Sequence, residues 1–243
     1  MPVYHGLATC QLRCGWVEQA LDTVREGLKH RRPNKFLLDL GVQVALEAGL
    51  VEEAAKYLED LKRFNEDADY HHRAATLLSA QGRHEEALVH AELAVRQGRT
   101  RFEVLAKRAD ILIDLERFDE AAREIDSLDE RFSVEAGRHD ARVGLRCKLL
   151  IRERKWRLAE EVLSQIGDQE TPQSRALRLD ILAQKVRDPS VSPGERERAL
   201  KLTTALEHQR TSKTIVSSDD DAPELEETAE DEPDVVGGEV KEA

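Results

Sequence analysis

A short motif recurs along the chain at an almost constant interval. In its clearest copy, Gly82–Leu88, an alanine follows five positions after a glycine. The equivalent alanines are Ala20, Ala54, Ala87, Ala121 and Ala159, so the successive steps are 34, 33, 34 and 38. An interval near 34 residues is typical of arrays in which every unit contributes a pair of helices. This periodicity therefore predicts a helical repeat array.

Each unit should consist of two antiparallel helices joined by a tight turn. Apolar or small residues recur sixteen, twelve, ten and nine positions before the alanine and four positions after it, and such steps of three and four mark one face of a helix. The predicted break lies five positions before the alanine, at Gly15, Gly49, Gly82, Glu116 and Arg154. One hairpin cannot bury its apolar face alone, so the units must stack. We expect an all-α, right-handed superhelical solenoid of about twelve helices.

The chain resembles the tetratricopeptide repeat family. The resemblance is carried by the Gly-x-apolar-Glu-Glu-Ala cores, such as Gly49–Ala54 and Gly82–Ala87, by the small residue twelve positions earlier, and by the interval near 34 residues. It covers about residues 1–167. The aromatic residue that this family carries early in its first helix survives only as Tyr4, and the proline between units only as Pro33. Sel1-like, pentatricopeptide and half-a-tetratricopeptide arrays fit a similar spacing.

We divide the chain into three parts. Residues 1–167 should form five hairpins, residues 168–212 a degenerate sixth hairpin of capping helices, and residues 213–243 a disordered tail. Helix-start signals support these limits: an N-cap at Asn34, capping boxes at Thr100–Glu103 and Ser192–Glu195, and Pro172 at a first helical position. The tail is acidic and has no aromatic residue, so it cannot bury enough apolar surface to offset its ordering entropy.

Charge and composition exclude several classes of protein. The net charge is −12, but the segment 214–243 supplies −11 of it, and the rest of the chain carries 36 basic and 37 acidic groups. A nucleic-acid-binding array would show a basic stripe, which is missing here. No apolar run approaches the roughly 20 residues of a membrane span, and no signal segment opens the chain. Three cysteines give no disulfide framework, so we expect a reduced, cytoplasmic protein.

Few residues suggest chemistry. Cys10 and Cys14 lie near His5, but their spacing does not match a zinc site, and we expect both cysteines to act as small core residues. His71 should lie at the edge of the core and His72 on the inner face of its helix, where a metal site or a proton switch is the less favoured alternative.

The two tryptophans have different expected roles. Trp156 should pack in the core, and Trp16 should be exposed, where an aromatic side chain can anchor a partner. The chain has no phosphate loop, dinucleotide motif, zinc-protease helix or nucleophile elbow. We therefore expect no catalytic residue, no metal and no cofactor.

The resemblance implies a concave groove lined by the first helix of each hairpin. The residues expected to bind a partner there are His5, Thr9, Arg13, Asp39, Gln43, Glu47, Asp69, His72, Thr76, Glu103, Asp110, Asp114, Lys148 and Arg152. The middle of this set is acidic and its ends are basic. We expect solvent-facing carboxylates at the centre to attract a basic or amphipathic peptide; the alternative is that they only keep the surface hydrated.

Two functions fit this sequence. The first is a non-catalytic scaffold or adaptor that binds another protein or peptide, without nucleic acid or membrane. The second is the C-terminal sensor or oligomerisation arm of a larger signalling NTPase or regulator. The start at Met1-Pro2 favours the second, since the first helix presents Val3, Leu7, Cys10 and Cys14 without a polar cap. Either this helix packs on a partner or the chain is the end of a longer polypeptide.

Overall fold

The architecture is a series of helix hairpins. A computed structural model describes residues 2–29, 34–98, 101–133, 138–164 and 172–216, and these residues form twelve α-helices and no strand. The helices are α1 (Pro2–Arg13), α2 (Val17–Lys29), α3 (Lys35–Glu47), α4 (Val51–Lys62), α5 (Ala68–Ala80), α6 (His84–Arg96), α7 (Phe102–Asp114), α8 (Phe118–Arg131), α9 (His139–Arg152), α10 (Trp156–Leu163), α11 (Pro172–Arg187) and α12 (Pro193–Val216). The predicted all-α class is confirmed.

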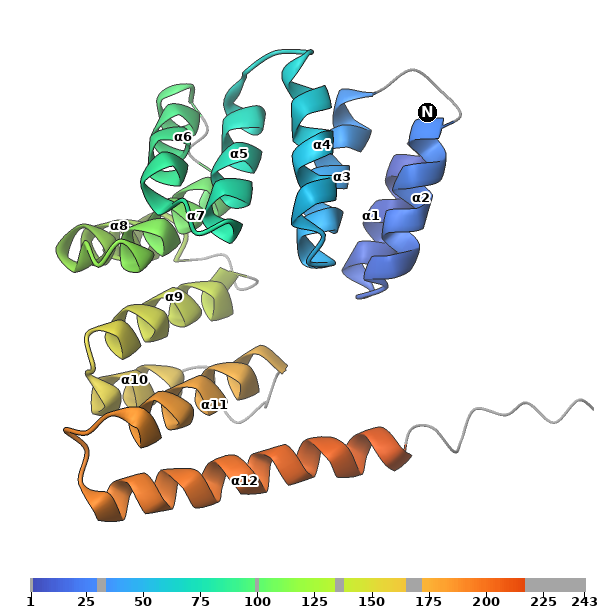
Figure 1. Cartoon of the computed structure of the whole chain (residues 1–243). Helices are drawn as coiled ribbons and strands as arrows, with labels where there is room; N and C mark the ends of the chain where they lie inside the picture. The colour runs from blue at the N-terminus through green and yellow to red at the C-terminus, as the bar shows by residue number, and fades with distance from the viewer. Residues whose placement is uncertain (1, 30–33, 99–100, 134–137, 165–171, 217–243) are drawn as a thin grey trace, which may run out of the picture.

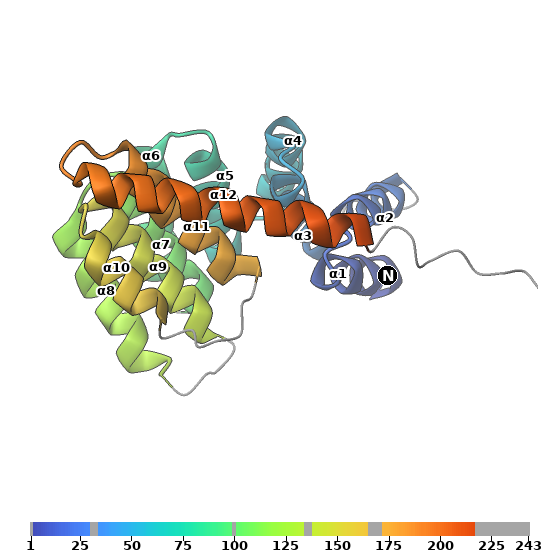
Figure 2. The same cartoon turned by 90° about the horizontal axis from the view of Figure 1, so that it is seen from below.

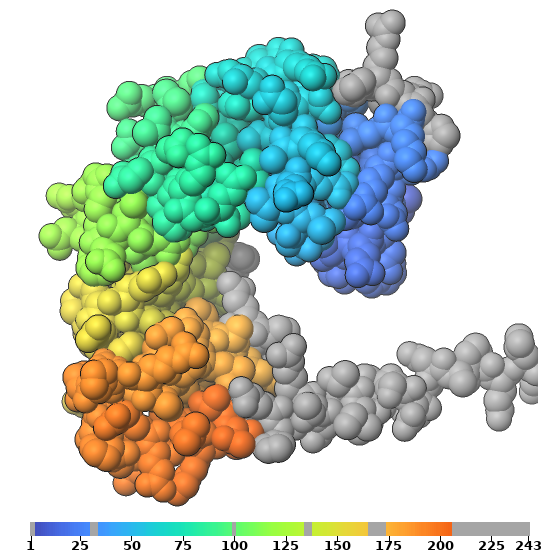
Figure 3. Space-filling view, viewed as in Figure 1, coloured from blue at the N-terminus to red at the C-terminus, as the bar shows by residue number. Residues whose placement is uncertain are grey.

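The hairpins stack into an arch. Each odd-numbered helix pairs with the even-numbered helix that follows it, and it also contacts the second helix of the preceding hairpin. Successive first helices from α1 to α11 touch one another as well, so they form the inner layer of the arch (Figure 1). The space-filling view shows the hollow that this curvature leaves (Figure 3). Helix α12 extends beyond α11 towards the side of the arch that holds α1 and α2 (Figure 2).

The five turns inside the hairpins share one backbone geometry. The residue five positions before each alanine has a positive φ: 80° at Gly15, 74° at Gly49, 75° at Gly82, 58° at Glu116 and 59° at Arg154. In the third hairpin the amide of Arg83 donates to Leu78 O at 2.9 Å, and the amide of Gly82 donates to Ser79 O at 3.0 Å. These two bonds define a Schellman motif, which ends the first helix. The predicted break positions are confirmed.

Small residues allow the two helices of each hairpin to approach closely. The five reference alanines are completely buried, and so are the residues twelve positions before them, which are Ala8, Val42, Ala75, Ala109 and Cys147. Cys147 therefore is the small core residue that the sequence predicted, and burial raises the pKa of its thiol to about 11. A larger side chain at these positions would separate the helices.

Most helix-start signals behave as predicted. Asn34 accepts a hydrogen bond from the amide of Phe36 at 2.8 Å, and α11 begins at Pro172. Ser192 accepts from the amide of Glu195 at 3.4 Å, but the Glu195 carboxylate accepts from the Ser192 hydroxyl instead of its amide. Thr100 lies outside the described residues, and the N-cap of α7 is Arg101, whose side chain makes no capping bond.

The end of the chain differs from the sequence-based boundaries. Helix α12 continues to Val216, beyond the end expected near Ser212. The disordered acidic tail was predicted over residues 213–243, but residues 213–216 belong to α12, and residues 217–243 lie outside the described residues. Among the described helices, none has the length and apolar character needed to span a bilayer.

Candidate partner-binding groove

The inner face of the arch holds a continuous groove with a volume of about 1430 Å³. Helices α3, α5, α7, α9 and α11 contribute its walls, and it opens as the hollow visible in Figure 3. Ten of the fourteen residues predicted from sequence line it: Asp39, Gln43, Glu47, Asp69, His72, Thr76, Glu103, Asp110, Lys148 and Arg152. Asp114 lies next to this lining, where it pairs with Lys148 and Arg152.

The remaining three predicted residues lie apart from the groove. His5, Thr9 and Arg13 are on α1, and none of them is part of the lining. The Thr9 hydroxyl donates to the His5 carbonyl at 2.7 Å within the helix. The groove therefore begins at the second hairpin, and the first hairpin forms the end of the arch.

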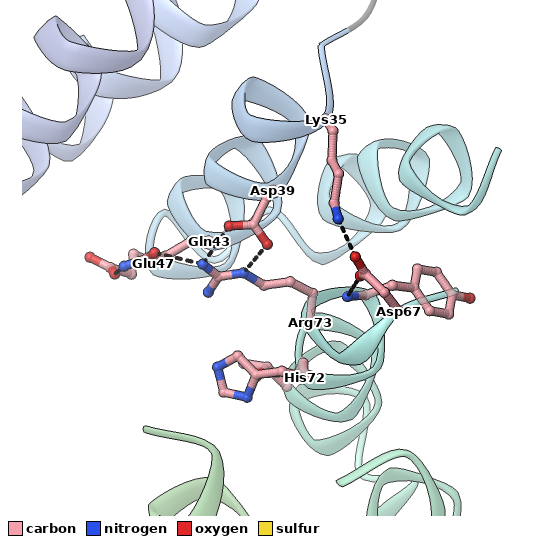
Figure 4. Close-up of polar contacts among 9 residues, drawn as sticks. Lys35, Asp39, Gln43, Glu47, Asp67, His72 and Arg73 are labelled. Atoms are coloured by element: carbon pink, nitrogen blue, oxygen red, sulfur yellow. Dashed lines mark hydrogen bonds and ion pairs between the residues drawn. The ribbon is translucent and has the colours of Figure 1, made fainter. Parts of the chain in front are cut away.

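An arginine joins two helices at the α3–α5 part of the groove. The Arg73 guanidinium donates to both carboxylate oxygens of Asp39, at 2.8 and 2.9 Å, and to Gln43 Oε1 at 3.1 Å (Figure 4). The Gln43 amide in turn donates to Glu47 at 3.0 Å. A bidentate arginine–carboxylate pair fixes both side chains in one geometry. Asp39 is therefore not a free carboxylate, and Gln43 is oriented by the same network.

Lysines neutralise the acidic centre on α7. Lys148 contacts Asp110 and lies 2.9 Å from Asp114, while Lys107 lies 2.9 Å from Asp110. Burial alone would raise the pKa of Asp110, but the two lysines outweigh it and hold that pKa below its usual value. The expectation of solvent-facing carboxylates at the centre of the groove is wrong, because their counter-ions come from α7 itself and from α9.

His72 lies on the inner face of α5, as predicted. Burial and the neighbouring Arg73 charge lower the pKa of its imidazole to about 4. His72 is therefore neutral near pH 7 and presents a hydrogen-bonding ring to the groove. Within the described part of the chain, no group of three or more His, Cys, Asp or Glu side chains is arranged to hold a metal ion.

The far end of the groove contains two arginines and a tryptophan. Trp156 is half-buried against the core of the last hairpins, as the sequence predicted, and its indole donates to Asp188 at 3.0 Å. It also lines the groove, together with Arg154 and Arg187. Both arginines are exposed, and neither forms a direct ion pair with any residue that the structure describes. The positive charge of Arg154 helps to lower the pKa of Asp188. This end therefore offers cationic groups for an external ligand.

Cys10 differs from its predicted environment. The sequence placed it in an apolar core position, yet both Cys10 and Cys14 are exposed. The equivalent Val44 is buried because α3 packs against α2, the second helix of the preceding hairpin. No described helix precedes α1, so within the described residues its outer face stays uncovered. The exposed Trp16 agrees with its prediction.

Solved structures share this arrangement of hairpins. A tetratricopeptide repeat protein from Parabacteroides merdae aligns with a TM-score of 0.61 over 84% of this chain and 84% of that chain, at 16% sequence identity. The chain has the tetratricopeptide-repeat fold. PilF of Pseudomonas aeruginosa aligns with a TM-score of 0.56 over 88% of this chain and 96% of that chain, also at 16% identity. No protein-family model and no curated protein matches the sequence.

Sequence reasoning missed part of the lining of this tetratricopeptide-type groove. Arg73 and Lys107 both lie fourteen positions before their reference alanines, a position left out of the predicted inner face. On α5 that position lies one helical turn from the predicted groove residues Asp69 and Thr76, so the periodicity of the first helix could have identified it. Arg154 was predicted only as a turn residue, and Arg187 only as part of the degenerate sixth hairpin. Neither was expected to line the groove.

Proposed function

We propose that this chain is a non-catalytic cytoplasmic scaffold that holds a segment of another protein in its groove. The observation that supports this proposal is the continuity of the lining across five first helices in one hollow of about 1430 Å³. Concave surfaces of stacked repeats are suited to extended or helical peptides. Lining side chains such as Arg73 and Lys148 are held in place by ion pairs between neighbouring helices, so little ordering entropy would be lost there on binding.

The charge of the lining favours a protein segment over a nucleic acid. Seven lysines or arginines and eight aspartates or glutamates line the groove. A nucleic-acid site would carry an excess of positive charge. A peptide with charges of both signs can satisfy a mixed lining of this kind.

The charges without a direct ion pair suggest the orientation of that segment. Glu47 on α3 is exposed and has no cationic partner among the described residues, whereas Arg187 lies exposed and without a described ion pair at the other end. Complementary charges orient a ligand and speed its approach. The proposed partner is an amphipathic segment with a basic side chain near α3 and an acidic side chain near α11.

A random-peptide phage library selected on the purified protein tests the proposal. Binding peptides are then synthesised with a fluorophore, and their affinity is measured by anisotropy. The double variant Glu47→Lys/Arg187→Glu should weaken binding by about tenfold or more, which corresponds to roughly 1.4 kcal/mol. Both residues are exposed, so the variant should keep the wild-type circular dichroism spectrum.

The matched control is Glu52→Lys/Glu85→Lys. Both glutamates are exposed on second helices, outside the groove lining. The control should bind every selected peptide with the affinity of the wild type. Equal losses in the two double variants, or a loss only in the control, would place the binding surface on the convex side and refute the proposal.

A further inference from the structure

The outer face of α1 carries an apolar stripe that is exposed. Val3 is 71% exposed, Leu7 is 49% exposed and Cys10 is exposed as well. These residues are three and four positions apart, so they lie on one face of the helix. They precede the reference alanine Ala20 by seventeen, thirteen and ten positions, respectively. We call this set the α1 stripe.

The first and last of these positions are covered in the next four hairpins. Seventeen positions before the alanine stand Leu37, Tyr70, Val104 and Arg142, which are 4–7% exposed. Ten positions before the alanine stand Val44, Leu77, Ile111 and Leu149, which are 0–5% exposed. At these two positions the α1 stripe is therefore the one exposed copy among the first five hairpins, whereas at the middle position Arg108 and Arg146 are also partly exposed.

Direct contacts identify what covers these positions. A Cβ atom placed on Gly41, thirteen positions before its alanine, would lie 3.1 Å from Cδ2 of Tyr57 in α4 of the same hairpin and 3.2 Å from Cγ1 of Val24 in α2. In the fifth hairpin, Arg146 pairs with Asp126 at 2.7 Å and Arg142 pairs with Asp129 at 3.0 Å. Val24 belongs to α2 and both aspartates belong to α8, and each is the second helix of the preceding hairpin. The α1 stripe is thus shaped to receive a second helix.

The opposite end of the arch offers such a helix. Helix α12 is the second helix of the last hairpin, and no described helix packs after it. Ala199 is buried, and α12 packs on α11. Leu202 borders a small cavity of about 290 Å³ with residues of α10 and α11, although it is itself 55% exposed. Leu200 lies two positions before Leu202, so it projects from the opposite flank, and it is 54% exposed.

We propose that the α1 stripe of one copy packs against the Leu200 flank of α12 in a second copy. The contact would repeat between copies the junction that joins successive hairpins within the chain. Because the two surfaces differ, the interface is heterologous. A pair of copies therefore leaves one unpaired surface at each of its two ends. Assembly then continues into head-to-tail chains and does not stop at a symmetric dimer. This association is separate from partner binding in the groove.

Sedimentation analysis of the full chain tests this proposal. The monomer mass is 27.5 kDa. Between about 10 and about 500 µM, the weight-average mass should rise about 1.5-fold or more and should not level off at the dimer. The chain carries a net charge of −12, so copies repel each other and the rise should be larger at about 0.5 M salt. Alkylation of Cys10 should slow over the same concentration range.

Two blocked variants distinguish this arrangement from other assemblies. Leu7→Lys blocks the α1 stripe, and Leu200→Lys blocks α12. Every contact between copies needs one surface of each kind, so either variant alone should remain monomeric. Both side chains are exposed, so both variants should fold. An equimolar mixture should form a dimer that cannot extend. Val89→Lys, at a side chain 57% exposed on α6, is the matched control and should assemble like the wild type.

Several outcomes would overturn the proposal. A wild-type chain that stays monomeric at every concentration and salt level would show that the stripe takes no second copy. Loss of assembly in Leu7→Lys but not in Leu200→Lys would indicate a symmetric contact between two α1 helices. A mixture that remains monomeric would show that the two surfaces do not pair with each other.

Discussion

Two adjacent glutamates on α4, Glu52 and Glu53, have different environments. Glu53 accepts hydrogen bonds from Arg25 of α2, at 2.7 and 2.9 Å, and from the Tyr57 hydroxyl at 2.6 Å. The Arg25 guanidinium holds the pKa of Glu53 low, at about 2. Glu52 is exposed. Adjacent positions on a helix face different directions, and here only one of them meets the preceding hairpin.

This difference gives a test at the level of one residue. Glu53→Gln should lower the free energy of unfolding by about 1 kcal/mol, because it removes the bidentate partner of Arg25, which is 40% exposed and keeps only its pair with Asp22. Glu52→Gln should change it by less than about 0.5 kcal/mol. Urea unfolding at pH 7 measures both. The stabilisation from Glu53 is present above its ordinary pKa of about 4.5 and is lost as the pH falls through about 2.

The lowered pKa of His72 predicts that the folded chain loses stability in acid. Its pKa in the folded state is about 4, below its ordinary value of 6.5, so the unfolded chain binds the proton more readily. The contribution of His72 to stability is therefore complete above pH 6.5 and declines as the pH falls towards 4.

A substitution isolates this effect. Between pH 7 and pH 4, His72→Gln should lose about 3 kcal/mol less stability than the wild type, since glutamine does not titrate. Thermal unfolding across this range measures the difference, and NMR titration of His72 gives the pKa directly. Identical pH profiles for the variant and the wild type would refute the assigned environment.

At the scale of the helix and its turn, the Schellman motif explains why glycine recurs. Gly82 has a φ of 75°, and a Cβ placed on it would meet no described atom within 4 Å. Gly82→Ala should therefore be destabilising only through the backbone, by about 1–2 kcal/mol. Gly194→Ala is the matched control, because Gly194 lies in α12 without a positive φ and with open space around it, so its stability should be unchanged or slightly raised. Chemical denaturation compares the two.

The elements were more predictable from sequence than the site. A turn such as Gly82 and a small position such as Ala109 are encoded within one hairpin, so the repeat interval locates them directly. The charges of the groove depend on contacts between hairpins. Arg73 meets Asp39 on the first helix of the preceding hairpin, and Lys148 meets Asp110 in the same way. A list of inner-face positions does not show which of these side chains pair.

The exposure of Cys10 has a similar cause. Its position in the repeat is apolar and buried in the later hairpins, but burial there depends on a helix that precedes the hairpin. A pattern inferred from internal units does not apply to the end of the array, where that neighbour is missing from the described chain. The sequence did indicate, through Val3 and Leu7, that the first helix lacks a polar cap.

At the scale of the whole molecule, stability should be distributed along the arch. In repeat arrays each unit contacts only its neighbours, so damage in one unit spreads by nearest-neighbour interfaces. Ala109 is completely buried between α7 and α8, and Ala109→Leu should lower stability by roughly 1–3 kcal/mol through overpacking. Hydrogen exchange should show lost protection in α5–α9 and little change in α1 and α2. A uniform loss over all helices would instead indicate one cooperative unit.

The curvature of the arch should depend on the ion pairs inside it. Arg73–Asp39 joins α5 to α3 and Lys148–Asp110 joins α9 to α7, so both draw neighbouring first helices together. The double variant Arg73→Ala/Lys148→Ala should open the arch and increase the radius of gyration measured by small-angle X-ray scattering. Arg83→Ala breaks a pair formed at the start of α6 alone and should leave the radius unchanged.

These ion pairs between helices should make the curvature of the arch elastic. Each pair links two neighbouring first helices on the concave side of the arch. A bound segment that draws a carboxylate away from its arginine or lysine would break the link between two neighbouring first helices. The distance between the two ends of the arch would then change. Occupancy of the groove would then be converted into a change of length, which a partner held at α1 or α12 would experience as tension or slack.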